Sequence, residues 1–209
     1  MNMLVTAGPT REAIDPVRFL SNRSSGRMGF AVAAKAAEAG HAVRLVAGPV
    51  TLETPTGVER IDVVSAGEMC DAVTEHVAWC HALVMAAAVA DWRPAVVGSR
   101  KLKKGEGPLG LQLERTTDIL QSISHRKGER IFVGFAAETG DPEAEATRKL
   151  AAKSLDMIVA NDVSRPDAGF EVDTNAVTFI DQNGTTRHIE TAPKSEIAAE
   201  IVTWIEGRL

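Results

Sequence analysis

Residues 21–29 read SNRSSGRMG, and an alanine-rich run with helical propensity follows over residues 29–39. Gly26 and Gly29 flank the expected helix start, and the Ser24 hydroxyl precedes it. Backbone N–H groups at a helix N-terminus, with hydroxyls beside them, form a site for an anion such as a phosphate. The spacing matches neither the P-loop nor the dinucleotide fingerprint, so a plain glycine-rich connection explains it equally well.

Asn22 stands at the front edge of this stretch. A loop asparagine most often caps or pins its own loop. Its carboxamide can also donate a hydrogen bond to an oxygen of a reacting group and stabilise the charge that develops there. The sequence leaves both interpretations open.

Further polar side chains follow other apolar runs. Asp91 and Asn161 each come after such a run, where parallel strands present residues to ligands. Lys101 opens a KLKK run in a long loop, and Lys149 and Lys153 are four residues apart on one helical face. These types suit a nucleotide, because a carboxylate or amide can bind a base and lysines can meet a polyphosphate. Each also has an ordinary explanation as a turn residue or a solvated charge.

Other kinds of site find little support. The five histidines are scattered, and no Ser-His-Asp order or zinc-ligand spacing occurs. The formal net charge of −5 gives no argument for binding nucleic acid or a membrane surface. No apolar run approaches the ~20 residues that cross a bilayer, and two cysteines make no disulfide framework. We therefore expect a cytoplasmic protein with no nucleic-acid or membrane partner, and the sequence identifies no metal ligands.

The elements that must position these residues alternate along the chain. Apolar runs predict strands over residues 3–7, 42–47, 61–64, 82–87, 131–136 and 157–160, and helices are expected over 29–39, 66–79, 118–124, 142–152 and 195–206. Continuously apolar strands separated by helices predict a Rossmann-like α/β fold, a doubly wound and mainly parallel sheet. With 209 residues, of which 44% are hydrophobic, we expect one domain over 1–209.

Two segments interrupt this alternation. Residues 92–117 contain proline, glycine and the lysine run, so we expect a mobile loop at about 92–108 and a strand-like piece at 109–113. Asn183-Gly184 between two alternating runs predicts an antiparallel hairpin over about 175–190. Such a ribbon serves either as an interface or as a plain edge of the sheet.

The motifs taken together resemble one family. The order is VTAGPTREAIDPVRFLSNRSSGRMGFAVA, AAAVADWRP, KLKK, FVGFAAET and ANDVSRPDAGFEVDTNAVTFID. This pattern is similar to that of phosphopantothenate–cysteine ligases over essentially the whole chain. In many bacteria such a domain is the C-terminal half of a bifunctional protein whose other half is a flavin-dependent decarboxylase. The sequence leaves open whether this chain acts alone or as such a half.

The resemblance implies a reaction in coenzyme A biosynthesis. The carboxylate of 4′-phosphopantothenate attacks the α-phosphate of CTP and forms 4′-phosphopantothenoyl-CMP and pyrophosphate. The amine of L-cysteine then attacks the acyl carbon and releases CMP. The bacterial pattern favours CTP over ATP, and the family needs a divalent cation, normally Mg²⁺. The resemblance also implies a homodimer, and the predicted hairpin is our candidate for the dimerisation element.

The resemblance further implies roles for individual residues. Asn22 would hold the carbonyl of the acyl-nucleotide, and Lys101 would be a catalytic lysine of the mobile loop. The other nucleotide contacts would be Gly8, Ser24, Gly26, Gly29, Ala87, Asp91, Thr117, Asp118, Ile119, Leu120, Phe135, Lys149, Lys153 and Asn161. The family often has Asn-Pro where this chain has Thr116-Thr117, and a threonine cap would preserve the helix start there. Arg18 would meet the phosphate of phosphopantothenate or form a structural salt bridge.

Two other classes of function compete with the ligase. A nicotinamide-dependent oxidoreductase would carry an acidic ribose-binding residue at the end of the second strand. The sequence there reads AGPV, and no acid follows it until Glu53. The chain also contains no tyrosine for a Tyr-x-x-x-Lys pair. A non-catalytic nucleotide-binding partner of a flavoprotein would keep the phosphate loop without needing Asn22 and the lysine loop. We therefore predict the ligase.

Overall fold

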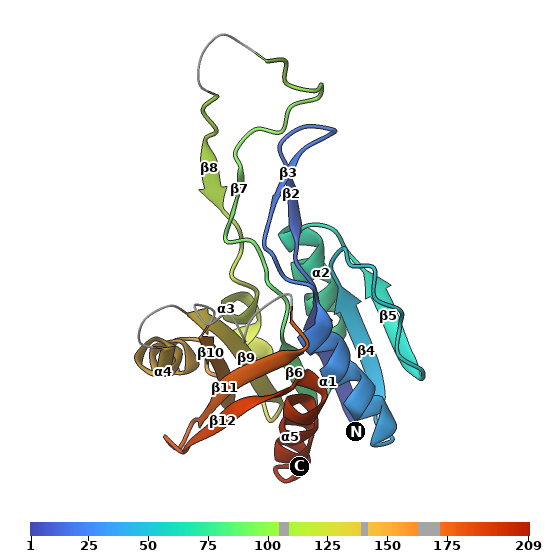
Figure 1. Ribbon diagram of the computed structural model, residues 1–209, viewed down its shortest axis with the longest axis vertical. Coiled ribbons are helices and arrows are strands. Elements are labelled where there is room, and N and C mark those ends of the chain that lie inside the picture. The colour runs from blue at the N-terminus through green and yellow to red at the C-terminus, as the bar shows by residue number, and fades with distance from the viewer. Residues whose placement is uncertain (105–108, 139–141, 163–171) are drawn as a thin grey trace.

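The structure is a computed structural model, and it describes residues 1–104, 109–138, 142–162 and 172–209. An eight-stranded sheet with the order β12-β11-β10-β9-β6-β1-β4-β5 forms its centre (Figure 1). Its strands are β1 (Asn2–Ala7), β4 (Ala42–Ala47), β5 (Val58–Asp62), β6 (Ala82–Met85), β9 (Ile131–Glu138), β10 (Met157–Asp162), β11 (Thr174–Asp181) and β12 (Thr186–Pro193). Neighbours from β10 to β5 pair in parallel, and β11 and β12 are antiparallel. The predicted mainly parallel α/β fold is confirmed.

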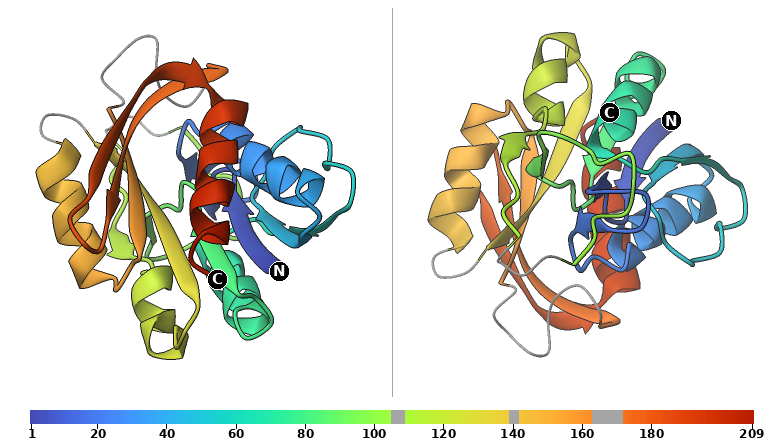
Figure 2. Two further views of the ribbon diagram at one scale, coloured as in Figure 1. Left: turned by 90° about the horizontal axis from the view of Figure 1, so that it is seen from below. Right: turned by 90° about the horizontal axis from the view of Figure 1, so that it is seen from above.

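Helices cover both faces of the sheet (Figure 2). The first face carries α1 (Arg27–Glu38) and α5 (Lys194–Glu206), and the second carries α2 (Ala66–His76), α3 (Ile119–Ile123), the 3-10 helix η1 (Ser124–Arg126) and α4 (Pro142–Ala152). Each face has its own core, with Phe30 and Ile201 buried in one and Met69 and Ile123 in the other. In the described part of the chain, no helix is long and apolar enough to cross a membrane.

The central strands are mainly apolar because both of their faces are buried. In β1, Met3 and Val5 belong to the core beneath α1 and α5, whereas Leu4 belongs to the opposite core. In β9, Val133 and Phe132 divide between the two cores in the same way. Successive strand residues point to opposite faces, so a strand with helices on both sides needs apolar side chains at most positions.

A long arm extends beyond the carboxyl ends of the parallel strands (Figure 1). It contains two short antiparallel ribbons, β2 (Arg11–Ala13) with β3 (Phe19–Ser21) and β7 (Trp92–Pro94) with β8 (Leu113–Arg115). We use "the arm" for residues 11–21 and the described part of residues 92–115. The sequence predicts neither ribbon, because strands of three residues are too short to show a periodicity.

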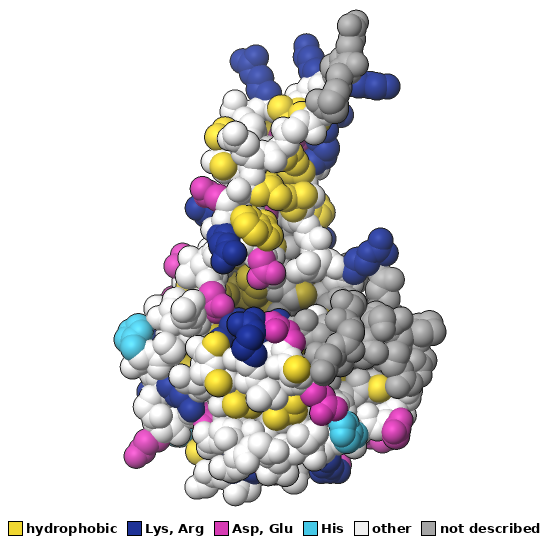
Figure 3. Space-filling model, turned by 90° about the vertical axis from the view of Figure 1, so that its left-hand side faces the viewer, with side chains coloured by type: hydrophobic (Ala, Val, Ile, Leu, Met, Phe, Trp, Pro, Cys, Tyr) yellow, Lys and Arg dark blue, Asp and Glu magenta, His cyan; other side chains and the backbone are white. Residues whose placement is uncertain are grey.

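The arm exposes apolar and basic side chains together. Figure 3 shows hydrophobic side chains along its length and lysine and arginine side chains around its tip. Large exposed apolar residues of the arm are Val17, Phe19, Trp92, Val96, Val97, Leu109, Leu111 and Leu113. The side chains of Arg100, Lys101, Lys103 and Lys104 are exposed as well. An apolar surface of this extent is typical of a contact surface for another protein chain.

The buried carboxylate of Asp15 joins the two parts of the arm. It accepts hydrogen bonds from the Arg18 guanidinium at 2.5 and 3.0 Å and from the Leu102 N–H at 3.0 Å. Arg18 also donates to the Leu102 carbonyl at 3.0 Å. These donors, Arg18 above all, hold the pKa of Asp15 well below its usual range. Of the two roles predicted for Arg18, the structural salt bridge is therefore present.

Several predicted boundaries differ from the structure, and the helix expected over 66–79 ends at His76. The third strand spans residues 58–62 rather than 61–64, because it is a half-buried edge strand whose apolar pattern is weak. The fourth strand ends at Met85 rather than at residue 87. The strand-like piece expected at 109–113 begins only at Leu113, where it pairs with Pro94.

The predicted hairpin is confirmed as β11 and β12. Its turn is stabilised by the Asp181 carboxylate, which accepts hydrogen bonds from the N–H groups of Asn183 at 2.9 Å and Thr185 at 3.0 Å. β12 is the edge strand of the sheet, and most of its residues are exposed. Of the predicted mobile loop, residues 105–108 lie outside the described residues.

Candidate active site

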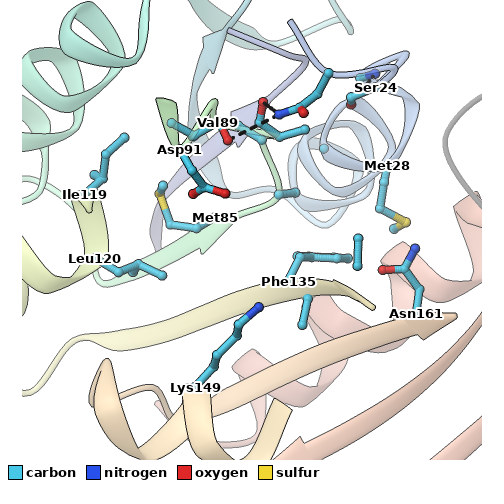
Figure 4. Close-up of a pocket in the computed structure, with 18 of the residues that line it drawn as sticks. Ser24, Met28, Met85, Val89, Asp91, Ile119, Leu120, Phe135, Lys149 and Asn161 are labelled. Carbon is cyan, nitrogen blue, oxygen red and sulfur yellow. Dashed lines mark hydrogen bonds between the residues drawn. The ribbon is translucent and has the colours of Figure 1, made fainter. Parts of the chain in front are cut away.

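A cavity of about 700 Å³ opens at the carboxyl ends of β1, β6, β9 and β10 (Figure 4). Open parallel sheets bind ligands at this edge, because the loops after neighbouring strands part there. The predicted residues that line it are Asn22, Ser24, Gly26, Gly29, Ala87, Asp91, Thr117, Asp118, Ile119, Leu120, Phe135, Lys149, Lys153 and Asn161. The structure thus brings together all of the predicted site residues except Gly8 and Lys101.

One end of the cavity is the start of α1. Gly26 precedes the helix in the left-handed conformation (φ 79°), and no side chain caps the helix. The Gly26 N–H donates to the Ser24 hydroxyl at 3.3 Å. A Cβ at Gly29 would lie 2.6 Å from the Ala7 Cβ and 2.7 Å from the Thr6 carbonyl oxygen. Glycine therefore lets α1 pack directly on β1, and the N–H groups of its first turn, which have no intrahelical partner, meet the cavity.

Gly8 supports this loop from behind and does not line the cavity. A Cβ at Gly26 would lie 3.3 Å from the Gly8 Cα. The carbonyl oxygen of Gly8 accepts a hydrogen bond from the Ala88 N–H at 2.9 Å. Gly8 therefore fixes the loops after β1 and β6 against each other.

Asn22 lies at the rim of the cavity, where it joins the same two loops. Its Nδ2 donates to the carbonyl oxygens of Ala88 at 3.0 Å and Val89 at 3.3 Å, drawn as dashed lines in Figure 4. The pinning role that the sequence left open is therefore present. The contact with a reacting carbonyl stays a prediction, and the position of Asn22 on the cavity lining is compatible with it.

The other end of the cavity is largely apolar. Ile119 and Leu120 are buried at the start of α3, and Phe135 is half-buried on β9. Met85 and Ala87 line the same region from the end of β6. Figure 4 shows Met85, Leu120 and Phe135 around the same space. Such a slot can hold a flat ring against side chains and strand backbone.

Two lysines of the α4 region line this end, each beside its own carboxylate. Lys149 lies 3.8 Å from Glu145, and Lys153 lies 2.9 Å from Asp118. In Figure 4 the Lys149 ammonium extends toward the cavity. The two carboxylates offset the mild repulsion of like charges four residues apart. The predicted lysine pair therefore faces the cavity. Asn161, at the end of β10, is buried and lines the cavity as well.

The departure from the family pattern at Thr116-Thr117 has a structural account. Asp118 caps α3 by accepting from the Gln121 N–H at 3.1 Å, so the expected threonine cap is wrong. Thr116 donates through its hydroxyl to the Ala90 carbonyl at 2.5 Å and through its N–H to the Asp91 carbonyl at 3.0 Å. Thr117 is exposed on the cavity lining.

Lys101 is the predicted site residue that the structure places elsewhere. It is exposed on the arm and does not line the cavity. The next residue, Leu102, is held through both its N–H and its carbonyl by Asp15 and Arg18. Lys101 therefore reaches a ligand in this cavity only after a movement of the loop or from another copy of the chain.

The cavity is also lined by two buried polar residues that the sequence does not single out. Asn175 on β11 is 3% exposed, and Lys194 at the start of α5 is 6% exposed. Burial lowers the pKa of Lys194, and the positive charge of Arg27 lowers it further, while Asp173 opposes the shift. A lysine at a helix start and an asparagine in a strand are ordinary in sequence, so only their depth in the fold distinguishes them.

Two carboxylates on the cavity lining bear on whether the site fits a divalent cation. Among the residues that the structure describes, no three His, Cys, Asp or Glu side chains are grouped to hold a metal ion. Asp91 and Asp118 are carboxylates on the cavity lining, and Asp118 is paired with Lys153. Mg²⁺ commonly binds through substrate phosphates and water with one or two carboxylates. A cation bound in this mode would have Asp91 as its protein carboxylate.

Comparison with known proteins identifies the family. The family model described as the DNA/pantothenate metabolism flavoprotein C-terminal domain matches residues 1–209. The chain is 48% identical over 202 residues to the coenzyme A biosynthesis bifunctional protein CoaBC of Bacillus subtilis (strain 168). The aligned region covers 96% of this chain and 50% of that protein. The CoaBC protein of Escherichia coli (strain K12) is 47% identical over 188 residues, with 88% and 46% covered.

A solved structure agrees with this assignment. The crystal structure of the C-terminal domain of a coenzyme A biosynthesis bifunctional protein CoaBC superimposes with a TM-score of 0.85 at 41% identity, covering 99% of this chain and 94% of that one. The chain spans about half the length of the curated relatives it matches. The family predicted from the sequence is confirmed, and the chain belongs to the DNA/pantothenate metabolism flavoprotein C-terminal domain family.

Proposed function

We propose that this chain is a ligase domain that joins 4′-phosphopantothenate to L-cysteine in coenzyme A biosynthesis. Its relatives of 47 to 48% identity carry the name coenzyme A biosynthesis bifunctional protein, which supports this pathway. The observation that carries the proposal is the layout of the cavity. An uncapped helix N-terminus, which suits phosphates, lies at one end, and an apolar slot bordered by two lysines, which suits a flat base, lies at the other.

The proposed reaction has two steps. The carboxylate of 4′-phosphopantothenate attacks the α-phosphorus of CTP, and the bond from that phosphorus to the bridging oxygen breaks to release pyrophosphate. The amine of L-cysteine then attacks the acyl carbon of 4′-phosphopantothenoyl-CMP. The acyl–oxygen bond breaks, CMP leaves with the electron pair, and the amine loses a proton as the amide forms.

The cavity offers a place for each part of the nucleotide. Backbone N–H groups at the start of α1 and the Ser24 hydroxyl would hold phosphates. Phe135 and Leu120 would hold the base, for which CTP is our proposal from the resemblance. Asn22 would face the acyl carbonyl from the rim, and Lys101 would bring a positive charge when the loop approaches. Mg²⁺ would be held by the phosphates, water and Asp91.

The proposal also covers the parent protein, the compartment and the oligomeric state of this domain. Relatives twice as long as the matched region suggest a second domain in the parent protein, and a flavin-dependent decarboxylase is the one we propose. Free Cys70 and Cys80 suit the reducing cytoplasm. We further propose a homodimer that forms through the arm, because stable interfaces bury apolar surface. The hairpin of β11 and β12 is the alternative, and its outer strand exposes mainly polar residues.

A pyrophosphate-release assay tests the ligase reaction. The chain is incubated with Mg²⁺ and 4′-phosphopantothenate, and CTP, ATP, GTP or UTP is supplied in turn. We expect release with CTP, no release without phosphopantothenate, and formation of the amide product only after L-cysteine is added. Release with ATP alone would replace CTP as the nucleotide, and no release with any of the four would remove the ligase proposal.

A further inference from the structure

Asn175 places a polar side chain on the core-facing side of β11. Over residues 174–179 this strand alternates between half-buried and buried side chains, and Asn175, Val177 and Phe179 take the buried positions. Val177 and Phe179 pack in the core beneath α1 and α5. Asn175 extends the same face into the cavity lining, where it is 3% exposed. An amide at this depth has left bulk water, so it needs a partner that the protein or a ligand supplies.

The Asn175 carboxamide has one end occupied and one end open. Its Oδ1 accepts a hydrogen bond from the Ala176 N–H at 3.1 Å. Its Nδ2 has no acceptor among the described residues. Within that part of the chain, the Arg130 Nε is the one fully enclosed side-chain nitrogen or oxygen without a partner, so the Asn175 Nδ2 must reach the space of the cavity. The group can therefore donate to an oxygen of a bound ligand.

Asn161 supplies a second buried amide next to the first. It lies opposite Val177 in the antiparallel pair of β10 and β11, so Asn175 is its diagonal neighbour. It is 7% exposed and lines the cavity, and its side chain bonds to none of the described residues. Figure 4 shows its carboxamide on the same side of the cavity as Met28, which belongs to the first turn of α1. The two amides together offer hydrogen-bond donors and the Asn161 acceptor to one ligand.

The start of α1 gives this corner of the cavity a positive potential. Arg27, its first residue, forms an ion pair with Asp173, two positions before Asn175. A helix N-terminus carries about +0.5 of an elementary charge, and the first turn of α1 contains no acidic residue to offset it. Negative charge on a ligand is therefore stabilised here. A ligand with N–H groups beside that charge fits better than a phosphate, because the Asn161 oxygen repels a group that carries only acceptors.

We propose that Asn175 and Asn161 bind L-cysteine, with the Asn175 Nδ2 donating to its carboxylate and the Asn161 Oδ1 accepting from its amine. This inference rests on the proposed function, which requires a place for the amino acid that attacks the acyl-nucleotide. The Met28 thioether lines the same side and offers the thiol a soft, polarisable neighbour. Contacts to both the carboxylate and the amine orient the nucleophile for its attack. The resemblance implies a nucleotide contact for Asn161 instead, and the two assignments predict different kinetics.

The two steps of the reaction separate these assignments. Pyrophosphate release from CTP and 4′-phosphopantothenate precedes the reaction of L-cysteine, whereas amide formation depends on it. We expect Asn175→Ala to lower kcat/KM for L-cysteine roughly 10- to 100-fold, the effect of a lost hydrogen bond to a charged group, and to leave pyrophosphate release unchanged. Asn161→Ala should also impair only amide formation. A nucleotide contact would instead weaken CTP binding in calorimetric titration and slow pyrophosphate release.

Cysteamine isolates the contact with the carboxylate. It has the amine and the thiol of L-cysteine but no carboxylate, so the wild-type chain should use it poorly. Asn175→Ala should leave amide formation with cysteamine unchanged, whereas Asn161→Ala should lower it, because the amine contact serves both substrates. The matched control is Asn183→Ala, the same change at the exposed tip of the hairpin, and it should leave both substrates unaffected.

A role of Asn175 in shaping the cavity alone predicts equal losses for L-cysteine and cysteamine, and that result would overturn the subsite. If Asn175→Ala does not fold, Asn175→Asp decides the question, because it keeps the shape and the acceptor for the Ala176 N–H while its carboxylate repels that of L-cysteine. Wild-type kcat/KM for L-cysteine in both Asn175 variants, or slowed pyrophosphate release in them, would also overturn it. A wild-type chain that releases no pyrophosphate with any nucleotide would instead refute the proposed function.

Discussion

The Asn22 side chain donates a hydrogen bond of 3.0 Å to the carbonyl oxygen of Ala88, a residue 66 positions away along the chain. This bond and the one to Val89 at 3.3 Å hold the loop after β1 against the loop after β6. Residues of both loops line the cavity. Asn22 is thus a structural link between the two loops, and its contact with an acyl carbonyl stays a prediction.

Asn22→Asp tests both roles with nearly the same side-chain shape. The new carboxylate would face two carbonyl oxygens that repel it, so we expect the rim to loosen and total turnover to fall at least about 10-fold. Pyrophosphate release should persist while amide formation slows, because the acyl carbonyl loses its donor. Quenched-flow separation of the two steps measures this. Asn183→Asp, at the exposed tip of the hairpin, is the matched control, and normal amide formation in Asn22→Asp would exclude the catalytic role.

Lys101→Gln tests whether the lysine of the arm reaches the reaction. Removal of a charge that acts only in the transition state should lower kcat by roughly 100-fold and leave Tm unchanged. Steady-state kinetics with CTP and phosphopantothenate measure the effect. The control is Arg100→Gln, its exposed neighbour, which should keep wild-type kinetics. A wild-type rate for Lys101→Gln would mean that the lysine run is only a solvated charge.

Asp15 should make the stability of the protein sensitive to acid. Arg18 and the Leu102 N–H hold its pKa below the usual range, so its stabilising contribution is complete above about pH 4 and is lost as the pH falls toward the lowered folded-state pKa. We expect Asp15→Asn to lower Tm at pH 7 and to flatten the decline of Tm between about pH 4 and about pH 2, where the wild-type carboxylate loses its contribution. Thermal unfolding at several pH values measures this. Asp62→Asn, an exposed carboxylate, is the control, and a decline as steep in Asp15→Asn as in wild type would contradict the assignment.

Gly29→Ala should displace the start of α1 and the glycine-rich loop before it, because the added methyl group clashes with β1. The added Cβ would meet Ala7 and the Thr6 carbonyl at distances under 3.0 Å, so α1 must move away from β1. We expect lower stability and weaker CTP binding. Gly67→Ala makes the same change in the first turn of α2, where the nearest atom is 3.7 Å away, and it should stabilise by up to about 1 kcal/mol. Urea unfolding and calorimetry of both variants test the contrast.

A dimer that forms through the arm and a dimer that forms through the hairpin should respond differently to substitutions on these two surfaces. Val96→Asp with Val97→Asp places charges on the most exposed apolar part of the arm and should convert a dimer into monomers in sedimentation velocity runs. Thr186→Asp on β12 should leave the dimer intact. Dissociation by Thr186→Asp alone would assign the contact to the hairpin instead.

Local sequence patterns account for the sheet and its order of elements. A strand such as β1, with helices on both faces, is apolar at most positions on both faces, and this leaves a nearly continuous signal in the chain. The Asn-Gly pair predicts the hairpin turn because few residue pairs suit so tight a turn. The edge strand β5 and the three-residue ribbons of the arm are missed, because half-burial and short length leave no periodicity to detect.

The sequence by itself determined the fold class, the glycine-rich loop at the start of α1 and, through its motifs, the family and most of the residues that line the cavity. Only the tertiary structure decided that Asn22 pins two loops, that Lys101 lies on the arm and that Lys194 is buried at the cavity wall. The Asp15–Leu102 contact spans 87 positions, and such contacts form only when the sheet brings distant loops together. Burial and long-range pairing are properties of the packed chain, so no local run of residues contains them.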